Sequence, residues 1–133
     1  MSQAINMRGL SQALSPVPGL LFALLFGSAR RGVLPSAESD VDVAVYLDHA
    51  PEFEERVAIL GAVQDAVNSD RVDVVFLNLT DNITLKREVL YGSLLVCHDP
   101  DQFASFFSIA DRQGRDERDR LERAWALRRE LHS

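Results

Sequence analysis

The order of apolar and polar positions along the chain predicts a small sheet. Residues 19–26 are almost wholly apolar, and residues 41–47 and 71–77 are rich in β-branched side chains. Runs of this length and composition are typical of buried strands. A turn at Gly92 is followed by a fourth strand-like run at residues 94–97. The uninterrupted apolar character of residues 19–26 predicts that this strand is central.

Apolar residues at helical spacing predict the elements that cover the sheet. Residues 2–14 predict one helix, and residues 52–68 form the clearest amphipathic pattern in the chain. A shorter helix is expected near residues 82–91. The apolar face expected for residues 52–68 consists of Phe53, Val57, Leu60, Val63 (or Gln64) and Val67.

The C-terminal part of the chain is expected to be helical. Asp99-Pro100 begins a helix, because proline is favoured at the first helical position. Beyond it, residues 111–133 carry Arg, Asp and Glu at helical pairing distance, which favours a solvated helix over a partner-binding surface anchored by Trp125. The apolar face of the first helix is expected at Phe103, Phe106, Phe107 and Ala110.

These elements predict an α/β (α+β) fold with a small mixed β-sheet flanked by helices. We expect residues 1–133 to form a single domain with a core at about 20–98 and C-terminal helices at about 100–131. The chain is 47% hydrophobic and 26% charged, which is ordinary for a globular protein. Its formal charge of −6 gives no overall electrostatic reason to bind nucleic acid directly.

Cysteine content and hydropathy exclude several classes of protein. Cys97 is the single cysteine, so an intramolecular disulfide is excluded. The longest apolar run, residues 17–26, is much shorter than the roughly 20 residues that cross a bilayer. The N-terminus lacks the basic, apolar and small-residue segments of a signal peptide. We therefore expect a cytoplasmic protein that has no membrane partner.

Three aspartates are the candidate chemical centre. Asp40 and Asp42 flank one residue at the start of a predicted strand, so their side chains should project to the same side. Neighbouring carboxylates repel each other unless a cation lies between them. Asp73 lies in the next apolar strand, where a charged side chain is unexpected unless it serves a function. If the two strands are neighbours, the three acids can meet and hold two Mg²⁺ ions.

A candidate phosphate cradle precedes these acids. Gly27 permits close backbone approach and Ser28 offers a hydroxyl, while the N–H groups of a following helix would favour an anion. Arg30 or Arg31 could add charge-assisted bonds to phosphates. Each motif alone has an ordinary explanation: a common turn, a solvated strand start, or an edge-strand charge. Their order along the chain favours one nucleotide site.

The stretch FGSARRGVLPSAESDVDVAV resembles the signature of the DNA polymerase β-like nucleotidyltransferases, Gly-Ser followed about ten residues later by Asp-x-Asp. The later stretch VDVVFLNLTDNITLKREVLYGSLLVCHDP and the small size resemble the MntA-type antitoxins, minimal nucleotidyltransferases paired with HEPN-domain ribonuclease toxins. The resemblance covers about residues 20–110. Eleven residues separate Ser28 from Asp40, one more than the commonest form, so a slightly longer turn is expected at residues 33–38.

This resemblance implies a role for each matching residue. Asp73 would help to activate the attacking hydroxyl, and Gly32 would close the glycine–serine motif. The implied catalytic and metal-binding residues are Asp40, Asp42 and Asp73, and the implied nucleotide-binding residues are Gly27, Ser28 and Arg31.

The resemblance also implies a reaction and a partner. Using Mg²⁺, the enzyme would transfer AMP from ATP to a hydroxyl, expected to be a tyrosine, of a cognate HEPN toxin, and so inactivate its RNase activity. Two alternatives stay open. One is a transferase for a small, aminoglycoside-type molecule, and the other is an antitoxin that neutralises its partner by stoichiometric binding. The nucleotide preference, the number of nucleotides transferred, and homo- or hetero-oligomer formation are also left open.

Overall fold

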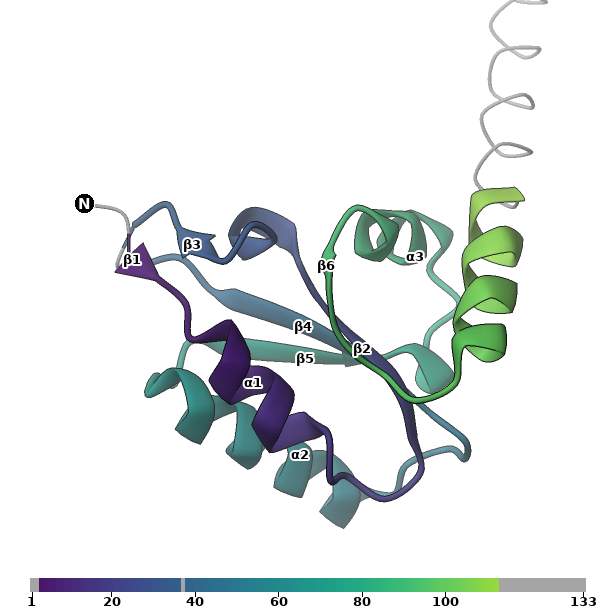
Figure 1. The fold of residues 1–133 in the computed structure, drawn as a ribbon, viewed down its shortest axis with the longest axis horizontal. Helices are drawn as coiled ribbons and strands as arrows, with labels where there is room; N and C mark the ends of the chain where they lie inside the picture. The colour runs from purple at the N-terminus through teal and green to yellow at the C-terminus, as the bar shows by residue number, and fades with distance from the viewer. Residues whose placement is uncertain (1–2, 37, 113–133) are drawn as a thin grey trace, which may run out of the picture.

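The computed structural model describes residues 3–36 and 38–112 (Figure 1). Its centre is a four-stranded mixed sheet in the order β5-β4-β2-β6. β4 is antiparallel to β2 and parallel to β5, and β6 is antiparallel to β2. The strands are β2 (Leu20–Phe26), β4 (Val41–Leu47), β5 (Val72–Phe76) and β6 (Ser93–Cys97). The predicted strands and the central place of β2 are confirmed.

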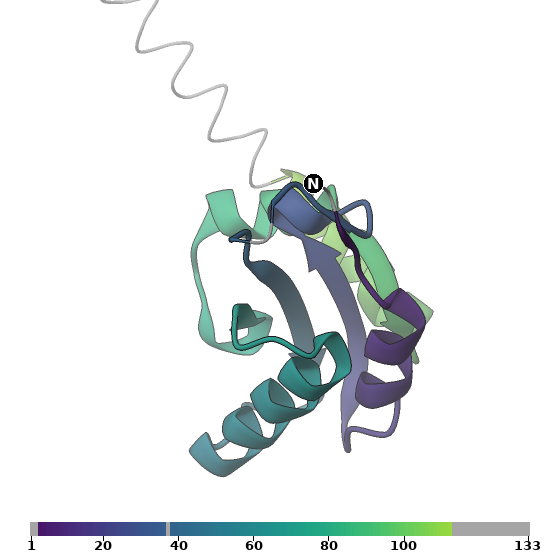
Figure 2. The same ribbon diagram turned by 90° about the vertical axis from the view of Figure 1, so that its left-hand side faces the viewer.

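Helices cover both faces of this sheet (Figure 1 and Figure 2). One face packs against α1 (Met7–Leu14) and α2 (Phe53–Val67). The other packs against α3 (Ile83–Leu90) and a helix that starts at residue 100 and is described to residue 112. The predicted fold class, a mixed sheet flanked by helices, is therefore confirmed.

Strand β4 is buried on both sides, which explains its apolar composition. Its odd-numbered residues face α1 and α2, and its even-numbered residues face the opposite layer. Because side chains alternate along a strand, Asp42 lies on the same face as Ala44 and Tyr46. The buried residues on the α1–α2 side are Val41, Val43, Val45 and Leu47. One polar position is thus inserted into an otherwise apolar strand at the end where β4 begins.

The C-terminal helix is anchored by aromatic side chains. Phe103 and Phe106 lie with ring centroids 5.1 and 5.5 Å from Phe22 of β2. Ala110 is buried as well, whereas Phe107 is 41% exposed. The expected apolar face of this helix is confirmed except at Phe107. Trp125 and the expected continuation of the helices to about residue 131 lie outside the described residues.

The apolar face expected for α2 is wrong in its N-terminal half. Phe53 and Val57 are 70% and 51% exposed, whereas Ile59 and Val63 are buried in the core shared with α1. The helix carries two apolar stripes, and helical spacing alone does not say which of them meets the sheet. Packing against α1 and the sheet selects the stripe through Ile59 and Val63.

The segment between β2 and β4 also differs from expectation. No α-helix follows the Gly-Ser turn; η1 (Gly27–Ala29) is a single 3-10 turn. The chain then forms β3 (Val33–Leu34), which pairs antiparallel with β1 (Gln3–Ala4), so the first two residues of the expected longer turn belong to a strand. The helix expected over residues 2–14 correspondingly begins later, at Met7.

Two further elements complete the described chain. η2 (Leu77–Leu79) is a 3-10 turn that ends β5 and leads towards α3. Asn82 caps α3, because its side-chain oxygen accepts a hydrogen bond from Leu85 N at 3.0 Å. Among residues 3–36 and 38–112, no helix has both the length and the apolar character needed to cross a membrane.

Candidate functional site

The pairing of β4 with β5 brings two of the predicted acids side by side. The two strands are parallel, and Asp42 is the register partner of Asp73. On its other side Asp42 is paired with Phe26, the last residue of β2. Asp40 lies just before β4 and is exposed. Strand adjacency, which the sequence analysis could only assume, is thus present.

Asp42 is the electrostatic centre of this arrangement. Partial burial raises its pKa to about 6, and the charges of Asp73, Asp40 and Glu88 contribute in that order. A raised carboxyl pKa means that the surroundings penalise the ionised form. Two of the predicted acids, Asp73 and Asp40, therefore act electrostatically on the third, Asp42, and Glu88 of α3 joins them.

Gly27 lies directly against the Asp42 carboxylate. Its φ of +73° is in the left-handed region, and a Cβ built there would overlap Asp42 Oδ2. Both facts demand glycine at this position. The Gly-Ser turn therefore lies against the Asp42 carboxylate.

A cavity of about 580 Å³ opens beside this turn. Such a volume is in the range of small-molecule sites. The turn is held in shape by its neighbours: Arg30 Nη1 donates a 3.3 Å hydrogen bond to Gly27 O, and Ser93 Oγ donates to Arg30 O. The cavity is lined by Gly27, Ser28, Arg30, Arg31, Glu88, Tyr91 and Ser93. The two arginines, the hydroxyl groups and the glycine backbone suit a polyphosphate, whereas Glu88 adds one carboxylate to the wall.

The structure gathers the predicted residues into two adjoining groups. Asp42 and Asp73 lie side by side with Asp40 within electrostatic reach, and the three predicted nucleotide-binding residues line the cavity. Glu88 and Tyr91 were missed. They are three positions apart at the end of α3, so both reach the cavity, but polar residues are ordinary on an amphipathic helix and gave no signal.

The donor set suits a hard divalent cation. Carboxylate oxygens are ligands that Mg²⁺ prefers. Burial first, and then the neighbouring carboxylates, raise the pKa of Asp42, and a bound cation would offset both penalties on its ionised form. Within the described part of the chain, no group of three or more His, Cys, Asp or Glu side chains is arranged to hold a metal ion. Mg²⁺ commonly takes only one or two protein carboxylates and completes its shell with water and substrate phosphates. The residues present therefore fit such an ion.

Comparison with solved structures shows the same fold. A chain of the MntA toxin–antitoxin in which two aspartates are replaced by glutamate has a TM-score of 0.74 and 20% identity, covering 97% of this chain and 100% of that one. A toxin–antitoxin with AMP-PNP has a TM-score of 0.72 and 21% identity, with coverages of 97% and 100%. A chain from the complex of tri-AMPylated Shewanella oneidensis HEPN toxin with MNT antitoxin has a TM-score of 0.66 and 19% identity, covering 96% of this chain and 97% of that one.

The sequence itself matches a family model. No protein with a curated description matches the chain. Residues 9–101 match the model described as Polymerase beta, Nucleotidyltransferase, and this span contains all three aspartates and the Gly-Ser turn. It covers well over half of the chain, so the protein belongs to the polymerase β nucleotidyltransferase family.

Proposed function

We propose that this nucleotidyltransferase is the antitoxin of a cytoplasmic toxin–antitoxin pair and transfers AMP from ATP to a tyrosine hydroxyl of a cognate HEPN-domain RNase. The observation that carries the proposal is the position of Asp42, between the Asp73 carboxylate and the Gly27 wall of the cavity. Structures of the same fold include an AMP-PNP complex and a tri-AMPylated HEPN toxin bound to MNT antitoxin, which supports both the nucleotide and the acceptor.

ATP would lie with its terminal phosphates in the 580 Å³ cavity. Ser28 and the backbone of the turn donate hydrogen bonds to these phosphates, and the exposed Arg31 guanidinium adds charge-assisted bonds. Arg30 is partly engaged with Gly27 O and so shapes the turn. This placement directs the α-phosphate towards Asp42, because the turn and the carboxylate are in contact.

Asp40, Asp42 and Asp73 are the residues that would hold Mg²⁺. Bound Mg²⁺ ions supply charge stabilisation for the attacking and leaving oxygens of an in-line displacement. The carboxylate of Asp42 occupies space that is free only because residue 27 is glycine. Glu88 adds to the negative field at the site without belonging to the matched motif.

The transfer breaks a phosphoanhydride bond of ATP and forms a phosphate ester bond to the acceptor. The acceptor hydroxyl oxygen forms a bond to the α-phosphorus, and the bond from that phosphorus to the oxygen bridging to the β-phosphorus breaks. The hydroxyl proton passes to the Asp73 carboxylate, and the released electron pair leaves with pyrophosphate. Asp73 is exposed on an edge strand, where a hydroxyl from another protein can reach it. The products are the AMP ester of the acceptor and pyrophosphate.

The test uses α-labelled ATP, Mg²⁺ and a HEPN-domain protein from the same organism as the candidate partner. Wild type should label the HEPN protein, and Asp42→Asn should not. Asp65→Asn is the matched control, because Asp65 is an exposed acid of α2 that does not line the cavity. A HEPN protein with its acceptor tyrosine changed to phenylalanine should take no label.

Two results would contradict the proposal. Absence of label with wild type would remove the catalytic role. Full protection of cells by Asp42→Asn would assign the antitoxin effect to stoichiometric binding, because that mode needs no carboxylate at the site.

A further inference from the structure

The cavity beside the Gly-Ser turn has two walls that come from distant parts of the chain. One wall is the turn itself with the two arginines that follow it. The other consists of Glu88 and Tyr91 at the end of α3 and Ser93 at the start of β6. We call this second wall the α3 wall. None of its side chains takes part in the proposed contacts with phosphate or Mg²⁺.

The two walls differ in charge. The guanidinium groups of Arg30 and Arg31 attract phosphate oxygens. Glu88 is the single carboxylate among the cavity-lining residues in the part of the chain that the structure describes, and Tyr91 adds an aromatic ring. A carboxylate repels phosphate oxygens, but it accepts hydrogen bonds from hydroxyl groups. The triphosphate of ATP is therefore drawn to the arginine wall, and the α3 wall suits the uncharged half of the molecule, which is the ribose and the base.

The α3 wall is fixed against the Gly-Ser turn. Val89 is fully buried in the core on this side of the sheet. Gly92 packs so closely against β2 that a Cβ there would overlap a backbone carbonyl oxygen of that strand. Ser93 Oγ donates a hydrogen bond to Arg30 O, which joins the two walls. Because the backbone on both sides of it is fixed, Tyr91 is held beside the cavity although it is 72% exposed.

The order of groups along the α3 wall matches the order of parts in a nucleotide. The charge of Glu88 acts on Asp42, so Glu88 lies at the acidic end of the cavity. Tyr91 follows three positions later, and the Cβ atoms of residues so spaced on a helix are about 5–6 Å apart. In ATP the ribose is attached to the α-phosphate, and the base is attached to the ribose. With the α-phosphate at Asp42, the ribose hydroxyls can reach Glu88 and the base can reach Tyr91.

We propose that the α3 wall binds the nucleoside half of ATP: Glu88 accepts hydrogen bonds from the ribose hydroxyls, and Tyr91 stacks on the base. A carboxylate that accepts a hydrogen bond from a ribose hydroxyl recurs in dinucleotide-binding folds. Stacking tolerates any base, because every base has a ring face. The α3 wall therefore selects a ribonucleotide and discriminates weakly between adenine and other bases. The inference rests on the proposed function, because that function places the triphosphate on the arginine wall.

The role of Glu88 is tested by the binding of ATP, 2′,3′-dideoxy-ATP and inorganic tripolyphosphate to the full chain in Mg²⁺, without an acceptor protein. Wild type should bind ATP about tenfold more tightly than dideoxy-ATP, because hydrogen bonds to a charged group are strong. Glu88→Ala should bring this ratio close to one and bind tripolyphosphate at least as tightly as wild type, because a repulsive charge is removed. The matched control is Asp65→Ala, which removes an exposed acid of α2 outside the cavity and should keep the ratio.

The stacking contact is tested with the same ligands. In Tyr91→Ser the Kd for ATP should rise about tenfold, whereas the Kd for tripolyphosphate, which has no base, should stay within about twofold of wild type. Tyr91→Phe keeps the ring and should retain the affinity for ATP. The matched control is Phe53→Ser, because Phe53 is 70% exposed, close to the 72% of Tyr91, but lies outside the cavity. This control should leave all three affinities unchanged.

The outcomes separate this inference from the proposed function. The inference is overturned if Glu88→Ala keeps the wild-type ratio, if Tyr91→Ser keeps the affinity for ATP, or if Tyr91→Ser weakens tripolyphosphate as much as ATP. The last result would show only that the turn has moved. In each of these cases the proposed function stands if wild type labels the HEPN protein with AMP. Wild type that shows the expected ligand preferences and does not label the HEPN protein contradicts the proposed function and leaves the nucleoside site standing.

Discussion

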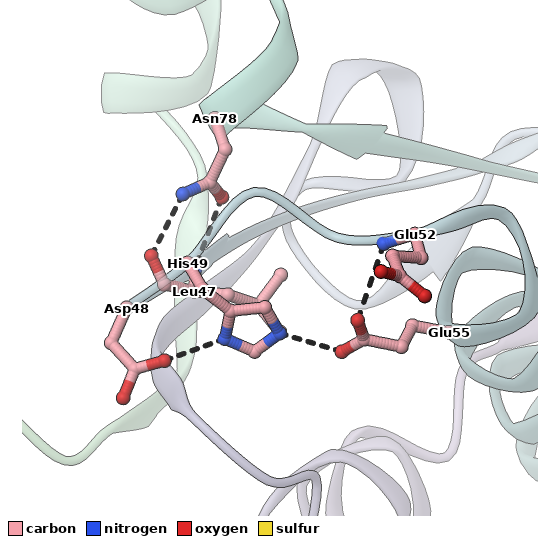
Figure 3. Close-up of polar contacts among 6 residues, drawn as sticks. All are labelled: Leu47, Asp48, His49, Glu52, Glu55 and Asn78. Atoms are coloured by element: carbon pink, nitrogen blue, oxygen red, sulfur yellow. Dashed lines mark hydrogen bonds and ion pairs between the residues drawn. The ribbon is translucent and has the colours of Figure 1, made fainter.

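Strand β4 has acidic side chains at both ends, and the surroundings of these acids differ between the two ends. Where β4 begins, Asp42 is surrounded by other carboxylates, which help to raise its pKa to about 6. Where β4 ends, His49 lies between Asp48 and Glu55, 2.6 Å from each (Figure 3). There the hydrogen bond from His49 lowers the pKa of Glu55, with a smaller contribution from the Glu52 backbone.

The far end of β4 is completed by the chain's own groups. Asn78 brackets Leu47: its Oδ1 accepts from Leu47 N at 2.9 Å, and its Nδ2 donates to Leu47 O at 2.7 Å (Figure 3). The difference teaches how to separate structural acids from functional ones. An acidic group whose charge is satisfied within the fold stabilises it, whereas one left with like charges around it is a site for an external cation.

The largest expected effect is that of Gly27→Ala. The new Cβ would overlap the Asp42 carboxylate at a backbone φ of +73°, so the turn or the carboxylate must move. We expect kcat/KM for AMP transfer to fall by at least about a hundredfold, because small displacements at a reacting centre have effects of this size. Labelling of the HEPN protein under initial-rate conditions measures it.

Gly61→Ala is the control for that change. Gly61 lies inside α2, and a Cβ there meets nothing within 4 Å. Activity should be unchanged and unfolding should become less favourable by roughly 0.5–1 kcal/mol, because alanine is the better helix former. Equal loss of transfer in both variants would contradict the importance of the Gly27–Asp42 contact.

Asn78→Ala should destabilise the fold at the C-terminal end of β4 and leave AMP transfer by the folded protein unchanged. It removes two hydrogen bonds and leaves the part-buried Leu47 N–H and C=O without those partners. The expected loss is about 1–3 kcal/mol of unfolding free energy, measured by urea titration. ATP binding should be retained at temperatures where the variant is folded. A loss of transfer larger than the loss of folded protein would show that the two ends are coupled.

Asp42→Asn should stabilise the fold while abolishing function. The folded-state pKa of about 6 lies above the ordinary aspartate value of 3.8. Ionised Asp42 therefore destabilises the fold, and this penalty is absent below pH 3.8 and fully present above about pH 6. Without Mg²⁺ at pH 8, the unfolding free energy of the variant should exceed that of wild type by on the order of 1 kcal/mol, after discounting for solvent screening. The gain should shrink towards pH 4. A gain that does not depend on pH would contradict this electrostatic origin.

The smallest expected effect is that of His49→Ala. Hydrogen bonds to Asp48 and then Glu55 raise the pKa of His49 above its ordinary 6.5. The stabilisation is therefore fully present below 6.5 and is lost as the pH rises through the folded-state pKa. The difference in Tm between wild type and variant should be larger at pH 6 than at pH 9, and activity should not change. Equal differences at both pH values would contradict a protonated His49.

Much of the fold follows from the sequence because the strands carry strong local signals. β4 was predicted with its observed bounds, since an apolar β-branched run buried on both faces has few alternatives. The buried face of α2 could not be chosen, because Phe53 and Val57 are as apolar as Ile59 and Val63. Only tertiary packing decides between the stripes.

In the candidate site too, some features follow from local sequence and others only from tertiary packing. Asp42 and Asp73 stand out because each interrupts an apolar strand, but their pairing depends on the adjacency and the register of the two strands, which the structure supplies. Glu88 could not be predicted, because its place at the site depends on which face of α3 is left uncovered. The 3-10 turn at Gly27–Ala29 was missed because a helix was expected after the Gly-Ser pair, whereas the left-handed backbone of Gly27 begins a single 3-10 turn.

The most direct test of the account is Mg²⁺ stabilisation measured as a shift in Tm at pH 7.5, with and without a non-hydrolysable ATP analogue. The account predicts that Mg²⁺ with the analogue raises the Tm of wild type, because the cation relieves the repulsion at Asp42. The shift should nearly vanish in Asp42→Asn and persist in Asp65→Asn. An equal shift in wild type and Asp42→Asn would contradict the claim that these carboxylates form the cation and nucleotide site.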